Sequence, residues 1–243
     1  MIWIFPIAGR GTRVKRLGKF KPFIDVYGEK IIQWCIKGIK HKFTKNDKFI
    51  FITTKSFEME FNVEETLEGI FQNEKIFNKI QIILSDKTPQ GPAASIYLSK
   101  KSLPEEEQCT IVNADQYVDF DTKPDILKNE AFLPLYFNNT GKSSYVEIKK
   151  GEIIAIHEKW MKTFYASSGV YSFGSTNLLI DVIEDCFKKK MLVNNEYYIG
   201  PAMNSIIDFG GKIYPTQTLV KFDLGSINGI ERLKQLLDMS IKK

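Results

Sequence analysis

Apolar runs and amphipathic stretches alternate along the first half of the chain. Four short apolar runs have the length and composition of buried strands: residues 2–8, 48–53, 79–84 and 109–113. Residues 29–43, between the first two runs, repeat apolar side chains at helical spacing, and residues 63–78 and 91–103 are also predicted to be helical. This alternation predicts a mostly parallel sheet with helices on both faces, whose ligands bind beyond the carboxyl ends of the strands.

The second half carries a denser set of strands. Four strands are predicted at residues 131–137, 144–149, 153–158 and 165–173, with a turn near 150–151. Helices are predicted at residues 175–189, 196–208 and 227–239. No linker, internal repeat or low-complexity tract separates the halves. We therefore expect a single α/β domain with a Rossmann-like mixed, mostly parallel sheet sandwiched by helices.

Composition narrows the class of protein only slightly. The 243 residues carry a net charge of +5, which is too small to indicate nucleic-acid binding by itself. No run approaches the roughly 18 apolar residues of a membrane span, and the first residues lack the basic region of a secretory signal. The three cysteines form no C-x-x-C pair and lie in apolar surroundings, so we expect buried thiols, no structural zinc and a cytoplasmic protein.

Positive charge is concentrated immediately after the first predicted strand. Residues 6–23, PIAGRGTRVKRLGKFKPF, contain two close glycines, six basic side chains and no acid. Glycine amides can approach an oxyanion closely and arginine matches phosphate oxygens, so the turn suits a polyphosphate. Val14 stands where a dinucleotide-binding fingerprint needs its third glycine, and no P-loop is present. On these residues alone, a solvated basic loop explains the turn equally well.

Two aspartates end apolar stretches that are far apart in the sequence. Asp115 closes TIVNAD, and Asp223 lies in KFDLGS. A carboxylate at a strand end must be solvated, paired or bound to a cation, and Mg²⁺ favours one or two carboxylates together with phosphate oxygens. Taken singly, each aspartate is better explained as the cap of a helix or turn.

As an ordered set, these segments resemble the sugar-phosphate nucleotidylyltransferase family over nearly the whole chain. The matching segments are IAGRGTR…KPF, QGPAAS (90–95), NAD (113–115), HEK (157–159), SSGVYSF (167–173), NEYYIGPAMNSII (195–207) and KFDLGS (221–226). The chain departs from the family pattern at Arg10, where glycine is commoner, and at Phe20 and Trp160, where proline is usual. Gln116 and residues 131–145 match no acceptor pattern, so the departures leave the acceptor open.

The resemblance implies the nucleotide-diphospho-sugar transferase fold, with a nucleotide-binding half at residues 1–130 and an acceptor-side lobe at 131–243. It implies that a nucleoside triphosphate reacts with a phosphorylated small molecule and releases pyrophosphate. The implied catalytic residues are Arg13 and Lys21, and Mg²⁺ is assigned to Asp115 and Asp223. The implied nucleotide-binding residues are Ala8, Gly9, Gly11, Thr12, Gln90 and Gly91. The implied acceptor-binding residues are Glu158, Lys159, Gly169 and Glu196.

Within this family we favour the small cytidylyltransferase branch that serves surface-polysaccharide and capsule pathways, with CTP as the nucleotide and phosphocholine or phosphoglutamine as the acceptor. A sugar-1-phosphate nucleotidylyltransferase using UTP or dTTP is the main alternative. A nucleic-acid-binding module, which the lysines around the apolar stripe of residues 29–43 would allow, and a catalytically silent nucleotide sensor are further alternatives. We expect neither a nucleic-acid nor a membrane partner, and the sequence does not indicate an oligomeric state.

Overall fold

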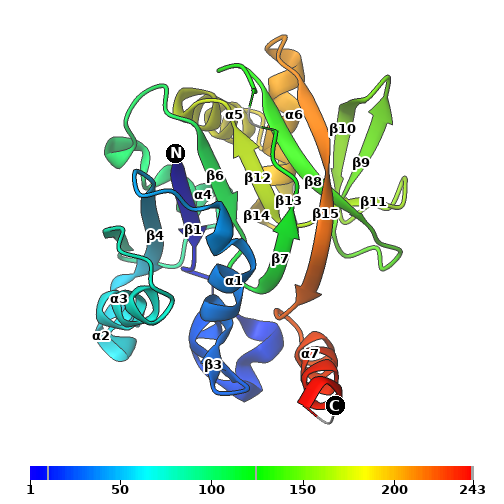
Figure 1. Cartoon of the computed structure of the whole chain (residues 1–243). Helices are drawn as coiled ribbons and strands as arrows, with labels where there is room; N and C mark the ends of the chain where they lie inside the picture. Colours follow the sequence, from blue (N-terminus) through cyan, green and yellow to red (C-terminus); the bar gives the residue numbers. More distant parts are fainter. Residues whose placement is uncertain (10, 124, 242–243) are drawn as a thin grey trace.

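The computed structural model describes residues 1–9, 11–123 and 125–241, without the side chains of residues 12, 13, 15, 240 and 241 (Figure 1). One 11-stranded sheet runs through both halves of the chain, with the main order β10-β9-β11-β8-β12-β6-β1-β4-β5 and with β15 joining β8 to β7. Its strands are β1 (Ile2–Pro6), β4 (Lys48–Thr54), β5 (Ile80–Ser85), β6 (Cys109–Val112), β7 (Gln116–Phe120), β8 (Ala131–Phe137), β9 (Ser144–Lys149), β10 (Glu152–Glu158), β11 (Tyr165–Ser167), β12 (Val170–Phe173) and β15 (Ile213–Asp223).

The first-half strands and the second-half strands pair differently. Strands β5, β4, β1 and β6 are parallel neighbours, as alternation of strands and helices requires. Strand β12 then adds to β6 in the antiparallel direction, and β15 pairs in parallel with β8 but antiparallel with β7. The predicted fold class is therefore confirmed, and each antiparallel pair of the large sheet includes at least one strand of the second half.

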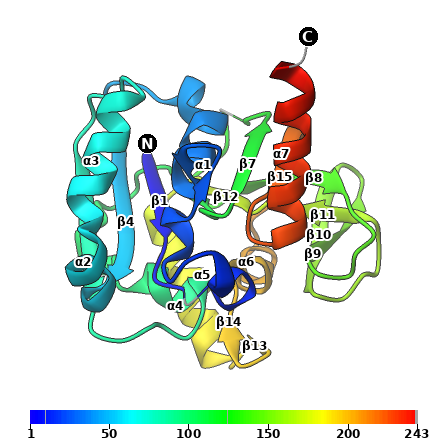
Figure 2. The ribbon, with the colours of Figure 1, turned by 90° about the horizontal axis from the view of Figure 1, so that it is seen from below.

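The central strand β1 divides the core into two layers because its side chains alternate between the faces. Ile2 and Ile4 pack with residues of α4 (Pro92–Tyr97), α5 (Thr176–Lys188) and α6 (Ile199–Asp208). Trp3 and Phe5 pack on the other face with α1 (Ile31–Ile39) and α3 (Val63–Asn73), which follows α2 (Lys55–Phe61) (Figure 2). Helices thus cover both faces of the sheet, as the sequence predicts.

A third, smaller core ties the basic segment to the C-terminal helix α7 (Ile227–Ile241). The basic segment forms η1 (Thr12–Leu17), η2 (Lys21–Phe23) and the hairpin of β2 (Asp25–Val26) and β3 (Glu29–Lys30). Val14 and Ile24 from this segment pack with Ile230 and Leu233 of α7. Because α7 directly follows β15, this core holds the basic segment beside the end of that strand.

Several sequence predictions differ from the structure. The helix expected at 91–103 ends at Tyr97, where Leu98 N bonds Ser95 O at 3.1 Å and the chain tightens toward η4 (Lys100–Ser102). The strand expected at 165–173 is split into β11 and β12 by Ser168 and Gly169, because Gly169 has a left-handed φ of +85°. The helix expected at 196–208 begins only at Ile199, because residues 196–197 form a short strand. Strands β7 and β15, the two short hairpins at residues 25–30 and 192–197, and helix α2 were not predicted. Within the described residues, no helix is long and apolar enough to span a membrane.

Candidate active site

The glycine turn after β1 rests directly on Lys21. Gly11 has a φ of +57°, and a Cβ at this position would lie 2.7 Å from the Cβ of Lys21. Glycine is therefore required both by the backbone conformation and by the approach of Lys21. Lys21 begins η2, and its Nζ donates to Oδ2 of Asp115 at 2.8 Å. The structure thus brings the turn after the first strand to the carboxyl end of β6.

The other predicted residues of this turn lie nearby, as far as they are described. Ala8 is buried, whereas Gly9 is exposed and a Cβ on it would meet nothing within 4 Å. Thr12 and Arg13 belong to η1, but their side chains lie outside the described part of the structure, as does Arg10. The roles implied for Thr12 and Arg13 therefore stay predictions.

Asp115 and Asp223 face the same small space although 107 residues separate them in the sequence. Asp115 lies between β6 and β7, and Asp223 is the last residue of β15, paired with Gln116 of β7. A Cβ on Gly225 would lie 2.5 Å from Oδ2 of Asp115 and 3.3 Å from Oδ1 of Asp223. A side chain at position 225 would collide with Asp115, so the glycine allows both carboxylates to lie beside this turn.

This donor set suits Mg²⁺. Asp223 accepts hydrogen bonds from Gly225 N at 3.0 Å and from the Ser226 hydroxyl. It therefore also caps the turn before α7, which is the role that the sequence suggested for this aspartate taken singly. Among the described residues no group of three or more His, Cys, Asp or Glu side chains could hold a metal by itself. Two carboxylates completed by phosphate oxygens and water are nevertheless the usual environment of Mg²⁺ beside a nucleotide. Asp115 and Asp223 are the residues that would hold it.

Lys221 is a residue of this site that the sequence analysis missed. It lies two positions before Asp223 on β15, and its Nζ donates to Ser168 O at 2.7 Å and to Oε1 of Gln116. Burial lowers the pKa of Lys221 to about 8, although Asp115 and Asp223 act in the opposite direction. The spacing of two along β15 places Lys221 and Asp223 on one face, but this strand was not predicted from the sequence.

Gly169, predicted to bind the acceptor, lies against the amides of Asn113 and Gln116. A Cβ on Gly169 would lie 2.8 Å from Nδ2 of Asn113 and 2.8 Å from Nε2 of Gln116. Since Asn113 and Gln116 flank Asp115 at close range in the sequence, Gly169 is adjacent to the carboxylate site.

Glu158, the last residue of β10, is half-buried. Its carboxylate accepts a hydrogen bond from the hydroxyl of Ser144, its partner across β9 and β10. Burial raises the pKa of Glu158, while the Ser144 hydrogen bond and Lys159 oppose the increase. Burial also raises the pKa of Tyr171 to about 12, and both Glu158 and Asp115 add to the increase. Tyr171 is therefore close to both Glu158 and Asp115.

Lys159 and Glu196 meet through one tyrosine. Lys159 Nζ donates to the Tyr198 hydroxyl at 2.6 Å, and this hydroxyl donates to Glu196. Lys159 has a φ of +56°, a left-handed conformation that is uncommon outside glycine and often found at functional sites. The chain therefore turns sharply after Glu158, and Lys159 is directed toward residues 196–198.

The segment predicted to contact the nucleobase packs against the same region. A Cβ on Gly91, whose φ is +98°, would lie 2.6 Å from Tyr197 O and 3.0 Å from Glu196 Cβ. Gln90 O accepts from Tyr197 N at 2.9 Å, and the Gln90 side-chain amide donates to Asn195 O at 3.0 Å. The structure thus places Gln90 and Gly91 beside the hairpin of β13 (Leu192–Val193) and β14 (Glu196–Tyr197).

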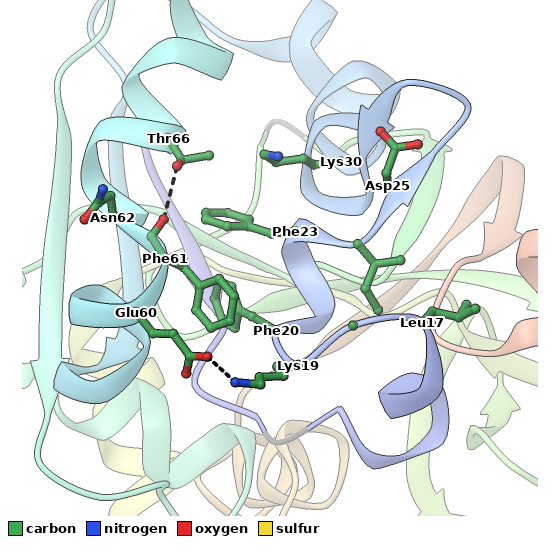
Figure 3. A pocket seen from close by; sticks show the side chains of 12 residues that line it. Leu17, Lys19, Phe20, Phe23, Asp25, Lys30, Glu60, Phe61, Asn62 and Thr66 are labelled. Carbon is green, nitrogen blue, oxygen red and sulfur yellow. Dashed lines mark hydrogen bonds and ion pairs between the residues drawn. The ribbon is translucent and has the colours of Figure 1, made fainter.

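A pocket of about 410 Å³ lies on the outer side of the basic segment and contains none of the predicted site residues (Figure 3). Aromatic side chains, among them Phe20, Phe23 and Phe61, line much of it, and Lys19 Nζ pairs with Glu60 at 2.7 Å at its edge. Lys19 and Lys21 therefore point in different directions. Of these two lysines, Lys21 is the one that bonds Asp115, whereas Lys19 pairs with Glu60.

Neither a protein-family model nor a curated protein sequence matches the chain. Solved structures do match. The nucleoside-diphosphate-sugar pyrophosphorylase from Vibrio cholerae RC9 has a TM-score of 0.80 and 18% identity, and the match covers 96% of this chain and 98% of that one. A UDP-glucose pyrophosphorylase complexed with UDP-glucose has a TM-score of 0.75 and 18% identity, with 98% of both chains covered.

The CTP:phosphocholine cytidylyltransferase from Streptococcus pneumoniae is also similar. Its TM-score is 0.70 and its identity 16%, and the match covers 97% of this chain and 99% of that one. These matches span nearly the whole of each chain, so this protein has the fold of the nucleotide-sugar pyrophosphorylases and related nucleotidyltransferases. The fold that the sequence resemblance implied is confirmed.

Proposed function

We propose that the protein is a Mg²⁺-dependent nucleotidyltransferase that joins a nucleoside triphosphate to a small phosphorylated acceptor. CTP is the favoured nucleotide, phosphocholine and phosphoglutamine are the favoured acceptors, and the product would supply surface-polysaccharide or capsule synthesis from the cytoplasm. One observation carries the proposal: Lys21, Asp115 and Asp223, from three distant segments, converge at one edge of this fold. That edge lies at the carboxyl ends of strands, where sheets of this type bind ligands.

The chemistry needs little beyond positioning and charge. An oxygen of the acceptor phosphate attacks the α-phosphorus, a new P–O bond forms, and the bond to the β-phosphate oxygen breaks, so that pyrophosphate leaves with the electron pair. The attacking oxygen is already ionised at neutral pH, and no general base is required. Mg²⁺ held by Asp115 and Asp223 would neutralise charge on the α-phosphate and the acceptor phosphate.

The chain's own residues would orient the two substrates. The amides of Gly9 and Gly11, together with Arg13, would hold the β- and γ-phosphates, and Lys21 would stabilise charge at the α-phosphate. Lys159 would hold the acceptor phosphate. The contact between Lys21 and Asp115 fixes both side chains before substrate arrives, and this preorganisation is what electrostatic catalysis requires.

A pyrophosphate-release screen tests the proposal. Each of the four nucleoside triphosphates would be combined with phosphocholine, phosphoglutamine and several sugar 1-phosphates in the presence of Mg²⁺. We expect release only when both substrates are present, and a loss of roughly 100-fold or more in Asp115→Asn. Asp86→Asn is the matched control, because Asp86 is 79% exposed and pairs only on the surface with Lys55. Absence of release from every pair, or full activity of Asp115→Asn, would contradict the proposal.

The same screen separates the alternatives. A UDP-glucose pyrophosphorylase of this fold also matches nearly the whole chain, so a sugar-1-phosphate nucleotidylyltransferase is the second candidate. Activity with UTP or dTTP and a hexose 1-phosphate alone would assign that function. Nucleotide binding without pyrophosphate release would instead indicate a non-catalytic nucleotide-binding protein.

A further inference from the structure

The loop that carries Lys159 is exposed, so specific contacts rather than burial hold it in place. Residues 159–164 connect β10 to β11, and most of them are exposed (Figure 1). Lys159 nevertheless adopts a left-handed conformation, with a φ of +56°. A residue other than glycine keeps such a conformation only where the surrounding structure over-determines it. The contacts on both sides of Lys159 therefore decide where its side chain points.

Strand β9 and the residue before it bind this loop through backbone carbonyls at two points. Ser143 O accepts a hydrogen bond from Lys159 N at 2.9 Å. Val146 O accepts a hydrogen bond from the Thr163 hydroxyl at 2.7 Å. These two bonds fix the ends of the loop, and the residues between them need a further anchor.

Glu147 of β9 provides this anchor, because its carboxylate is shared by a strand and the loop. Glu147 pairs with Ala155 across β9 and β10, so His157 lies diagonally opposite on the same face. Nε2 of His157 donates to Oε1 of Glu147 at 2.5 Å, and Nζ of Lys162 donates to the same oxygen at 3.3 Å. These two hydrogen bonds lower the pKa of Glu147, and the carboxylate therefore stays ionised at neutral pH.

Trp160 packs on the same histidine. Its ring meets the His157 ring edge-on, with 5.1 Å between the ring centres, and Lys162 Nζ lies 4.5 Å from the centre of the Trp160 ring. An ammonium above an indole ring is attracted to it. Glu147, His157, Trp160 and Lys162, which we name the Glu147 cluster, thus fix the residue that directly follows Lys159.

From this we infer that Glu147 is a positioning residue for the acceptor, because it holds the 159–164 loop in the conformation that directs Lys159 toward the acceptor phosphate. The inference rests on the proposed function and deepens it by naming what orients the residue that would hold this phosphate. Lys159 Nζ lies 2.6 Å from the Tyr198 hydroxyl, which is the direction that the Glu147 cluster maintains. Without Glu147 the loop samples other conformations, fewer molecules are competent to bind the acceptor, and the KM of the acceptor rises.

Alanine at position 147 removes both hydrogen bonds, and Glu152→Ala is the matched control. Glu152 belongs to the same hairpin, its side chain is 37% exposed against 35% for Glu147, and it pairs with Lys212 instead of the loop. We expect Glu147→Ala to raise the KM of the best acceptor roughly 5-fold or more and to change the KM of the nucleotide less than about twofold. Glu147→Gln, which keeps an accepting oxygen, should recover part of the loss, and Glu152→Ala should change neither KM.

A double-mutant cycle with Lys159→Met tests whether Glu147 acts through Lys159. In the Lys159→Met background the effect of Glu147→Ala on kcat/KM for the acceptor should fall below about twofold, since the side chain that the cluster orients is then absent. Amide hydrogen exchange gives a readout that does not depend on activity. Peptides that cover residues 159–164 should exchange faster in Glu147→Ala than in the wild type and at an unchanged rate in Glu152→Ala.

The outcomes separate this inference from the proposed function. Faster exchange of the loop, together with a higher KM of the acceptor that depends on Lys159, would support the inference. If Glu147→Ala leaves the exchange or the KM of the acceptor unchanged, or acts equally with and without Lys159, the inference is wrong while nucleotidyl transfer stands. If no pair of substrates releases pyrophosphate, the proposed function is wrong and the role of Glu147 toward an acceptor is wrong with it.

Discussion

Replacing Gly11 with alanine adds a single methyl group where the basic turn meets Lys21. The φ of Gly11 is +57°, and an L-residue in this conformation costs about 1–2 kcal/mol. The new Cβ would also lie 2.7 Å from the Cβ of Lys21, much closer than van der Waals contact, and overpacking of this kind costs typically about 1–3 kcal/mol. The expected loss in unfolding free energy is therefore roughly 2–5 kcal/mol.

The same methyl group should impair catalysis more than stability. Relief of the contact requires Lys21 to move, and its bond of 2.8 Å to Asp115 depends on the present position. A displacement of about 1 Å in a catalytic group lowers the rate roughly 100-fold. Gly151→Ala is the matched control, because Gly151 has a φ of +81° and a Cβ there would meet nothing within 4 Å. It should lose about 1–2 kcal/mol of stability and none of the activity.

Urea unfolding and pyrophosphate release, measured on both variants, decide the matter. Equal stability and equal activity of Gly11→Ala and Gly151→Ala would refute the packing of the turn on Lys21. A Gly11→Ala protein that loses stability but keeps full activity would refute the role of Lys21.

Three further results are expected. Lys21→Met should lower kcat roughly 100-fold while the KM of the acceptor stays close to that of the wild type; an unchanged kcat would remove Lys21 from the site. Burial tends to raise the pKa of Glu74, but hydrogen bonds from Gln33 and Lys40 outweigh it and hold the pKa below its usual value. The ionised Glu74 therefore stabilises the folded protein at pH values above the pKa that this carboxyl has in the unfolded state, and the stabilisation is lost as the pH falls through the lowered pKa of the folded state. Glu74→Gln should lower the free energy of unfolding at pH 7 and have no such effect in acid. Urea unfolding measured across this pH range checks the prediction. Burial raises the pKa of all three cysteines, so a disulfide reagent should react slowly with the folded protein and completely after unfolding; fast reaction of the native protein would contradict their burial.

Strands with a simple burial pattern could be predicted from the sequence. The bounds expected for β8 and β9 match the structure at both ends, because β8 is an apolar run and β9 begins with buried residues after a polar turn. Strand β15 was not predicted because its two ends pair with different strands. Residues 213–217 pair with β8, and residues 218–223 pair with β7, with a register shift between Thr218 and Val220. A strand that changes neighbours has no single apolar face, so its sequence lacks the alternation that reveals a strand.

The residues of the candidate site also differ in whether they could be predicted from the sequence. Asp115 and Asp223 could be proposed because each ends a recognisable segment, and the structure places them together. Lys221 could not be assigned, because an isolated lysine on a polar strand is normally a solvated residue. Its partners are a backbone carbonyl of Ser168 and the amide of Gln116, which only the tertiary structure brings within reach. Contacts of this kind leave no trace in the local pattern.

The most direct test of nucleotidyl transfer follows the α-phosphate itself. Each nucleoside triphosphate, labelled at the α-phosphorus, would be incubated with the protein, Mg²⁺ and the acceptors, and the products would be separated. We predict that the label passes into a nucleoside-diphosphate-linked acceptor while unlabelled pyrophosphate is released. Label found only in the starting triphosphate, or in a free nucleoside mono- or diphosphate, would contradict the assignment.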